Sequence, residues 1–279
     1  MHLGLIGCGK MGQALIKGVL HAQLCAHEEI TIHDRFAEPV NHLVSTLGLH
    51  AAGSNQAVAD QADTVILAVK PSDIVSLLTQ LTHTNTPTLF ISIAAGIRIS
   101  TLEQALEIPQ SHHRIIRVMP NTPALIRKAA SAYTIGSTAT ESDAASAERI
   151  LGAVGLIERV PENLLDAVTA LSGSGPAYIF AMIESMIAGA IDLGLNPSTA
   201  RHLTLQTVIG AAEMVAETGE SPAQLRENVT SPNGTTFAAL QSMQANHFDE
   251  TIRSAIEAAH SRSLELGKQS ADEFPLQTD

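Results

Sequence analysis

The sequence predicts an α/β Rossmann domain with a mostly parallel, open sheet, followed by an all-α domain. Two observations support this fold class. Through the first half of the chain, short apolar runs alternate with helical patterns, which is typical of parallel strands joined by crossover helices. After Pro161 the strand patterns end, and the remaining segments have helical periodicity. We therefore expect two domains, over residues 1–160 and 161–279.

The expected strands are short apolar runs in the first half. Right-handed crossovers between parallel neighbours would give an open sheet that binds its ligand at the carboxyl ends of the strands. One helix, over residues 141–154, separates the last two strands. The strands cover residues 2–7, 29–34, 64–69, 88–94, 114–119, 131–136 and 156–160.

In the second half, proline and glycine mark the expected helix ends. Asn196 and Ser221 each precede a proline, so a capping side chain stands before a proline at the first helical position. Helices are expected to end at Gly194, Gly219 and Gly267.

These helices are rich in Ala, Gly, Ser and Met, and several are too apolar on all sides for an isolated bundle. We therefore expect them to be buried in a homo-oligomer. The most apolar run, 178–195, contains Glu184 and Asp192. These two charges favour a buried helix over a membrane span.

The composition of the 279 residues disfavours several classes of partner. A formal net charge of −12 argues against nucleic acid, and 3% aromatic residues leave little to stack bases. Cys8 and Cys25 form no spacing motif, which favours a reducing compartment. No basic segment precedes the apolar start of the chain, so we expect no targeting signal and a cytoplasmic protein.

A glycine-rich motif follows the first expected strand. Gly7, Gly9 and Gly12 form a G-x-G-x-x-G that opens a helix. The three glycines allow a tight turn, the approach of a pyrophosphate and close packing of helix on strand. In this strand–turn–helix context the motif predicts a dinucleotide site.

Asp34 and Arg35 end the second strand, where the adenine ribose is recognised. An acidic residue favours the free 2′-hydroxyl of NAD, whereas a neighbouring arginine accommodates the 2′-phosphate of NADP. Arg35 could also be an ordinary solvated charge. The sequence therefore leaves the choice between NADP and NAD open.

Later strands end in distinctive loops on the same edge. They are Lys70-Pro71, Ala94-Ala95-Gly96 and the run from Pro120 to Pro123. Small or rigid residues there let the backbone approach a flat cofactor ring. Ordinary turn chemistry explains any one of these loops, but their shared edge favours a binding site.

The stretch from Ser231 to Thr236 reads SPNGTT between two helical segments. Pro232 fixes φ, Asn233 and Gly234 tolerate positive φ, and the hydroxyls can donate or accept hydrogen bonds. A helix that begins at Thr235 or Thr236 would present unpaired backbone N–H groups, which suit a small anion.

The sequence argues against a metal site and against a hydrolase. We expect no metal site, because neither His112-His113 nor the group His21, Cys25 and His27 has the spacing of a ligand set. Ser174 stands between two glycines but follows no strand, which argues against a hydrolase nucleophile. Residues 172–175 suit a helix kink or a capped helix start instead.

Six motifs together resemble pyrroline-5-carboxylate reductase, an NAD(P)H-dependent enzyme of proline biosynthesis. The likeness runs from about residue 3 to about residue 266. It implies a Rossmann domain followed by a helical domain that interlocks with a partner subunit, and reduction of L-1-pyrroline-5-carboxylate to L-proline. The motifs are GLIGCGKMGQALIKG, AVKP, ISIAAGI, RVMPNTPA, ALSGSGPAYIF and ENVTSPNGTTFAAL.

The resemblance also implies roles for residues. The substrate carboxylate would bind in the loop of Ser231, Gly234, Thr235 and Thr236, and the Thr236 hydroxyl would lie near the ring nitrogen and assist its proton. Relatives usually have glycine where Asn233 stands. The cofactor would be lined by Ile6, Gly7, Cys8, Gly9, Lys10, Met11, Asn55, Ala68, Val69, Lys70, Pro71, Ala94 and Ala95.

Two rival functions remain open. Another NAD(P)H-dependent imine or hydroxyacid reductase would use a catalytic Lys or Asp in the helical half, whose single lysine is Lys268 near the terminus. A protein that senses NADP(H) without turnover would leave the loop from Ser231 to Thr236 unexplained.

Overall fold

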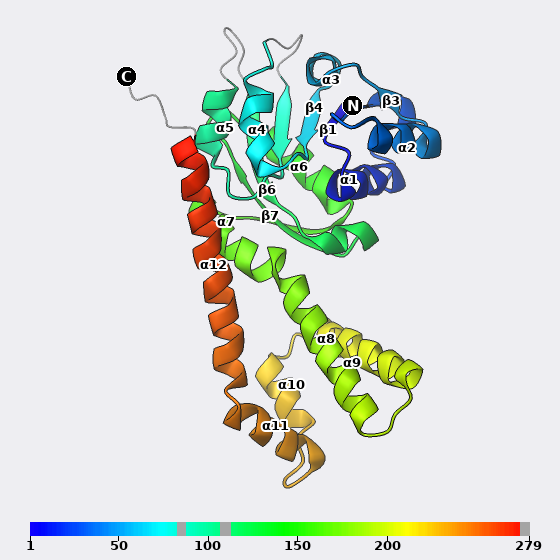
Figure 1. The fold of residues 1–279 in the computed structure, drawn as a ribbon, viewed down its shortest axis with the longest axis vertical. Helices are drawn as coiled ribbons and strands as arrows, with labels where there is room; N and C mark the ends of the chain where they lie inside the picture. Colours follow the sequence, from blue (N-terminus) through cyan, green and yellow to red (C-terminus); the bar gives the residue numbers. More distant parts are fainter. Residues whose placement is uncertain (83–87, 107–112, 274–279) are drawn as a thin grey trace. The chain divides into compact units, whose positions relative to one another are not determined.

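The computed structural model describes residues 1–82, 88–106 and 113–273. The chain forms two compact units. The first contains Met1–Ser174 together with the chain from Ala259 onward, and the second is Gly175–Ala258. Figure 1 shows the helices and strands of both.

The first unit is built on an eight-stranded sheet in the order β3-β2-β1-β4-β5-β6-β7-β8. All neighbouring strands are parallel except β6 and β7, which are antiparallel. The predicted mostly parallel sheet and its seven strands are confirmed, and the two-residue β3 is an addition. The strands are β1 Leu3–Ile6, β2 Ile30–His33, β3 His50–Ala51, β4 Thr64–Leu67, β5 Leu89–Ser92, β6 Arg114–Met119, β7 Ala129–Ile135 and β8 Gly155–Arg159.

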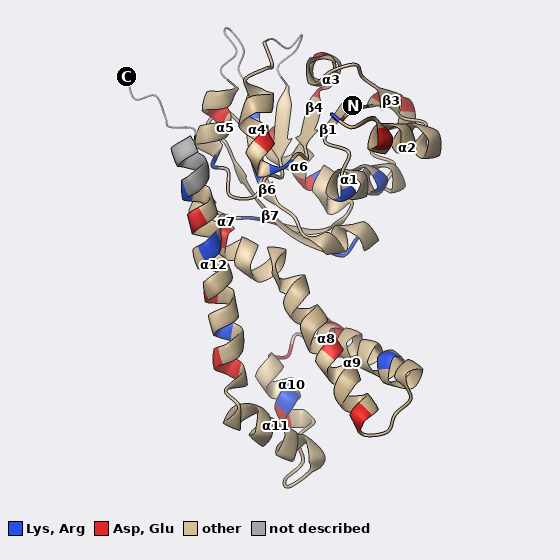
Figure 2. Ribbon diagram, in the orientation of Figure 1, with Lys and Arg blue, Asp and Glu red and all other residues tan. Residues whose placement is uncertain are grey.

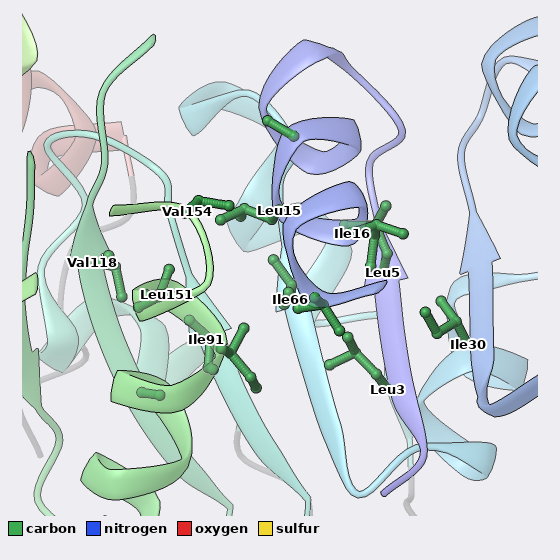
Figure 3. Close-up of a cluster of buried hydrophobic side chains, with 14 of the residues drawn as sticks. Leu3, Leu5, Leu15, Ile16, Ile30, Ile66, Ile91, Val118, Leu151 and Val154 are labelled. Atoms are coloured by element: carbon green, nitrogen blue, oxygen red, sulfur yellow. The ribbon is translucent and has the colours of Figure 1, made fainter. Parts of the chain in front are cut away.

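Helices cover both faces of this sheet. Because side chains alternate along a strand, Leu3 and Leu5 of β1 join one buried cluster while Ile6 joins the other. Figure 3 shows the first cluster, in which Leu15 of α1 packs with Val154. The helices are α1 Lys10–His21, η1 His27–Glu29, α2 Ala37–Leu47, α3 Asn55–Gln61, α4 Pro71–Leu78, α5 Ile99–Ala105, η2 Thr122–Ile126 and α6 Glu141–Gly152.

From Glu162 onward the described chain is helical, as predicted. Residues 172–175 lie at a kink and not at a capped helix start, because α7 runs directly into a π-helical turn that ends just before α8. The caps at Asn196 and Ser221 are confirmed, since each side chain accepts a hydrogen bond from the helix N-terminus. The elements are η3 Glu162–Leu164, α7 Leu165–Val168, η4 Thr169–Gly173, α8 Gly175–Asp192, α9 Pro197–Thr218, α10 Pro222–Asn228, α11 Thr235–Ala245 and α12 Phe248–Glu273.

One prediction about these helices is wrong. Gly267 does not end a helix, because α12 continues to Glu273. A Cβ at Gly267 would lie 3.2 Å from the carbonyl oxygen of Gly96, so the glycine allows close packing inside the helix. The apolar run 178–195 is exposed in the single chain, since α8 has no buried residue, and its burial in an oligomer stays a prediction.

The second unit exposes much of its apolar surface. Phe180 of α8 is 59% exposed and Leu203 of α9 is 56% exposed. The helical run Glu162–Asp192 is long and apolar enough to cross a membrane by length and composition, which is weak evidence by itself. An exposed apolar surface of this kind is typical of a subunit interface.

Candidate active site

The cofactor-binding residues predicted from the sequence converge at one edge of the sheet in the first unit. The parallel strands are in register there, since Ile6 pairs with His33 and Leu67, and Leu67 pairs with Ser92. The loops that follow these strands are therefore neighbours. They contain Gly7 to Gly12 after β1, Asp34 and Arg35 after β2, Asn55 after β3, Ala68 to Pro71 after β4, and Ala94 and Ala95 after β5.

The three glycines of the loop meet three different constraints. Gly7 has a φ of +99°, and a Cβ there would lie 2.6 Å from the backbone of Ala68. A Cβ on Gly12 would lie 2.3 Å from the carbonyl oxygen of Gly7, so this glycine lets α1 pack on β1. Gly9 has an ordinary φ of −69°, and its Cβ would meet no protein atom within 4 Å.

The surroundings of Gly9 fit a dinucleotide. Neither packing nor backbone conformation requires a glycine there, so the open space above it suits a group from outside the chain. Gly9 is the N-cap of α1, and no side chain caps this helix. The first N–H groups of α1, from Lys10 and Met11, have no acceptor within the helix and can bind a diphosphate.

Asp34 holds the glycine loop to the end of β2. Its Oδ2 accepts a hydrogen bond from the Cys8 N–H at 2.7 Å, and its Oδ1 accepts one from the Phe36 N–H at 2.9 Å. Each carboxylate oxygen can accept a second hydrogen bond, so Asp34 can also receive a ribose hydroxyl. Sequence reasoning found the position of Asp34 but missed its contact with the loop backbone.

Arg35 forms an ion pair on the surface of the first unit. Its guanidinium lies 3.2 Å from a carboxylate oxygen of Asp73 in the first turn of α4, and 4.9 Å from the ring centre of Phe36. The side chain of Arg35 is 60% exposed, so the ion pair contributes little stability. A phosphate can therefore replace Asp73 at low cost. No motif in the sequence indicated Asp73.

Cys8 is the buried centre of the loop. Burial, and secondarily the charge of Asp34, raises the pKa of the Cys8 thiol to about 12. Its Sγ lies 3.7 Å from the carbonyl oxygen of His33. The thiol is therefore protonated at neutral pH and serves packing in place of redox or nucleophilic chemistry.

Asn121 connects the loop after β6 to the π-helical turn. Its Nδ2 donates to the carbonyl oxygen of Ser172 at 2.9 Å, and its Oδ1 accepts from the Ala130 N–H at 3.0 Å. Asn121 is 7% exposed, and a Cβ on Gly173 would lie 2.6 Å from Met119. The loop from Pro120 to Pro123 is thus fixed against the start of the helical region.

In the second unit, residues Ser231 to Gly234 form a tight turn before α11. The Gly234 N–H donates to the carbonyl oxygen of Ser231 at 3.0 Å, and Asn233 has a φ of +56°. Proline followed by a residue with positive φ is the pattern of a type II turn. Asn233 therefore adopts a left-handed conformation, which asparagine and glycine tolerate best. A Cβ on Gly234 would lie 2.3 Å from Ser231 Oγ, so a side chain at this position would displace the serine hydroxyl.

Helix α11 begins at Thr235, as predicted. Gly234 is its N-cap, and no side chain caps the helix. The N–H groups of Thr235 and Thr236 have no acceptor within the helix, and Thr236 is half-buried while Thr235 is exposed. The turn and the helix N-terminus thus form a neutral site with several donors for a small anion.

Within the described ranges, no group of three or more His, Cys, Asp and Glu side chains is placed to hold a metal ion. His112 lies outside the described residues. The region around Ser174 is a π-helical turn leading into α8, without the strand that precedes a hydrolase nucleophile.

Two family models match the chain. The model for pyrroline-5-carboxylate reductase dimerisation matches residues 162–266, and the model for NADP oxidoreductase, coenzyme F420-dependent, matches residues 2–96. The first therefore covers the exposed apolar helices and the turn before α11. The second covers the edge of the sheet with the glycine loop.

Relatives resemble the chain over nearly its whole length. The pyrroline-5-carboxylate reductase of Methanosarcina acetivorans is 42% identical, and the match covers 96% of this chain and 98% of the relative. The pyrroline-5-carboxylate reductase of Pseudomonas aeruginosa is 41% identical, and the match covers 96% of this chain and 97% of the relative.

Solved structures agree. The Coxiella burnetii enzyme has a TM-score of 0.87 at 36% identity and covers 95% of this chain and 98% of its own. The Plasmodium falciparum enzyme, solved with NADP bound, has a TM-score of 0.86 at 32% identity. The match covers 96% of this chain and 98% of the Plasmodium chain. With the same motifs, fold and length, the chain belongs to the pyrroline-5-carboxylate reductase family.

Proposed function

We propose that this protein is an oxidoreductase that reduces L-1-pyrroline-5-carboxylate to L-proline with NADPH, the final step of proline biosynthesis. The observation that supports this most is the turn before α11. It keeps the type II conformation with Asn233 in place of glycine, and it leaves the first N–H groups of the helix available. The carboxylate of the substrate can accept hydrogen bonds from these N–H groups.

The edge of the sheet would hold the cofactor. Gly9 leaves room for the diphosphate, the N-terminus of α1 binds it, and Arg35 exchanges Asp73 for the 2′-phosphate. Asp34 can receive the ribose hydroxyls of NADH, so we expect NADH to be used as well. NADPH supplies the hydride that reduces the C=N carbon.

The turn before α11 would hold the substrate. The N–H groups of Thr235 and Thr236 bind the carboxylate. The Gly234 N–H, expected from the sequence to be a third donor, instead bonds to the carbonyl oxygen of Ser231, and this hydrogen bond is how Ser231 supports the turn. The Thr236 hydroxyl orients the imine nitrogen and assists its proton. A protonated imine is already electrophilic, so the reaction needs no catalytic lysine.

We further propose a cytoplasmic homo-oligomer with at least two subunits, in which 1–160 binds the cofactor and 161–279 binds substrate and partner. The exposed apolar residues of α8 and α9 lie inside the region matched by the dimerisation model. Pairing with a second copy removes these side chains from water, which explains their composition without a membrane.

The test is NADPH oxidation by the purified protein with pyrroline-5-carboxylate, and separately with an open-chain 2-oxo acid. We expect rapid oxidation and formation of proline with the cyclic imine only. Turnover of the oxo acid alone would indicate a hydroxyacid reductase. Binding of NADPH without turnover of either compound would indicate a sensor and overturn the proposal.

A further inference from the structure

A basic hollow lies beside α1 in the first unit and extends from Lys10, in the glycine loop, to His21 near the end of the helix. It has a volume of ≈ 310 Å³, within the range of small-molecule sites. One wall is a face of α1 with Lys10, Lys17 and His21, and the other is the end of η2 with Leu125 and Arg127. Figure 2 shows the basic residues of α1 in blue.

The charge of this hollow is unusual for the molecule. Its lining contains two lysines, one arginine and one histidine but no carboxylate, in a chain whose net charge is −12. Among the described residues, the ion pairs of the structure involve none of these three cations. Three like charges around one hollow repel each other, and an anion between them relieves that repulsion.

The position of the cations follows from helical geometry. Lys10, Lys17 and His21 are seven and four residues apart, so they share one face of α1. Arg127 has a φ of +60°, a left-handed conformation that an arginine adopts only at some cost in free energy. Arg127 takes this conformation as the C-cap of η2, which puts it on the wall opposite α1.

The cofactor does not account for this cluster. In the site described above, the 2′-phosphate is recognised at Arg35 after β2 and the diphosphate at the N-terminus of α1. Lys17 and His21 lie two and three turns further along the helix, a distance of roughly 10–16 Å at 1.5 Å per residue. They are too far from the first turn to bind the same phosphate.

We propose that the hollow between α1 and η2 binds a small phosphate-bearing anion, with Lys17 and Arg127 as its principal ligands. Charged nitrogen donors on two walls suit the several oxygens of a pyrophosphate group. That group could come from inorganic pyrophosphate or from a nucleotide, and the two sources share the same contacts. Apart from Lys10, the residues that line this hollow have no role in the proposed reductase reaction.

The test is isothermal titration of the full-length protein with inorganic pyrophosphate, and in a second series with ATP. We expect the double variant Lys17→Gln, Arg127→Gln to raise the Kd for both about tenfold or more, because two charge-assisted contacts are lost. Tighter binding of ATP than of pyrophosphate identifies a nucleotide as the source. Equal binding identifies the phosphates alone.

The control is Lys128→Gln, which removes the same charge from the next residue, outside the hollow. It should leave both Kd values nearly unchanged, and Arg127→Lys should retain most of the affinity. Unchanged reductase activity shows that the double variant is folded; if it is not, Lys17→Gln alone replaces it. The proposal is overturned if the wild type binds neither anion, or if the double variant binds them as tightly as the wild type.

Discussion

At the scale of single residues, the glycines of the loop after β1 differ in what they exclude. Gly9 faces open space, whereas Gly12 faces the carbonyl oxygen of Gly7. We expect Gly9→Val to abolish NADPH binding with little change in melting temperature, because the valine fills only the space meant for the diphosphate.

The matched control is Gly12→Val. It forces α1 away from β1 and should destabilise the protein by about 1–3 kcal/mol or more. Titration with NADPH and thermal melting distinguish the two variants. Undiminished NADPH affinity in folded Gly9→Val would refute this position for the cofactor.

Thr236 is the residue to which we assign a role in the chemistry. Thr236→Ala should lower kcat/KM about 10- to 100-fold, equal to roughly 1.5–3 kcal/mol, if its hydroxyl binds a nitrogen that is cationic in the transition state. Thr235→Ala should be milder, because that residue contributes mainly its backbone N–H. Steady-state kinetics and melting temperatures of both variants are the measurement. A Thr236→Ala enzyme with lower stability but full activity would leave the hydroxyl only a helix-capping role.

The two cysteines should differ in reactivity. Burial, and then Asp34, raises the pKa of Cys8 from its ordinary value of 9.0 to about 12, whereas Cys25 is only half-buried. At about pH 8, iodoacetamide should therefore modify Cys25 well before Cys8, as mass spectrometry of peptides would show. Because the pKa of Cys8 is raised in the folded protein, its contribution to stability is complete at pH values below the ordinary pKa of 9.0. This contribution is lost as the pH rises towards 12. Equal labelling of both thiols would contradict the burial of Cys8 in the glycine loop.

At the scale of elements, the loop after β6 depends on Asn121. Asn121→Leu leaves the Ala130 N–H and the Ser172 carbonyl without their partner in a buried site. We expect a loss of about 2–4 kcal/mol in the free energy of unfolding. Asn246→Ala, which removes one exposed hydrogen bond, should cost less than about 0.5 kcal/mol. Urea denaturation at one protein concentration compares the two, and equal effects would refute the role of Asn121.

The elements that the sequence predicted are those with strong local signals. The seven predicted strands are short runs rich in apolar residues, and Asn196 and Ser221 carry complete cap patterns. The two-residue β3 has no such run, and the π-helical turn at 169–173 lies beside Met119, a neighbour distant in sequence. Gly267 resembled a helix end because its real constraint, the backbone of Gly96, is distant in sequence.

The candidate site was predicted to a similar extent. Glycine and proline patterns located the loop after β1 and the turn before α11, since these residues determine backbone conformation locally. Asp73 beside Arg35 and Asp34 beside Cys8 are contacts between separate strands and helices. Contacts of this kind require the fold and cannot be inferred from spacing along the chain.

At the scale of the whole molecule, the exposed apolar helices predict association. We expect at least a dimer by light scattering at micromolar concentration, because Phe180 is 59% exposed in the single chain. Phe180→Asp should shift the protein towards a monomer, since it places a charge in the interface. The control is Leu156→Asp in β8. Leu156 is 62% exposed but lies outside the matched dimerisation region, so this variant should remain associated. A monomeric wild type would count against the proposed oligomer.

The central claim is that this chain transfers hydride from NADPH to a cyclic imine. The most direct measurement uses NADPH deuterated at nicotinamide C4, with pyrroline-5-carboxylate as substrate and mass spectrometry of the product. The account predicts proline with a single deuterium at C5 from the wild type, and almost none from Gly9→Val. The account would be contradicted if no proline forms. It would also be contradicted if proline carries no deuterium from either the 4R- or the 4S-deuterated NADPH.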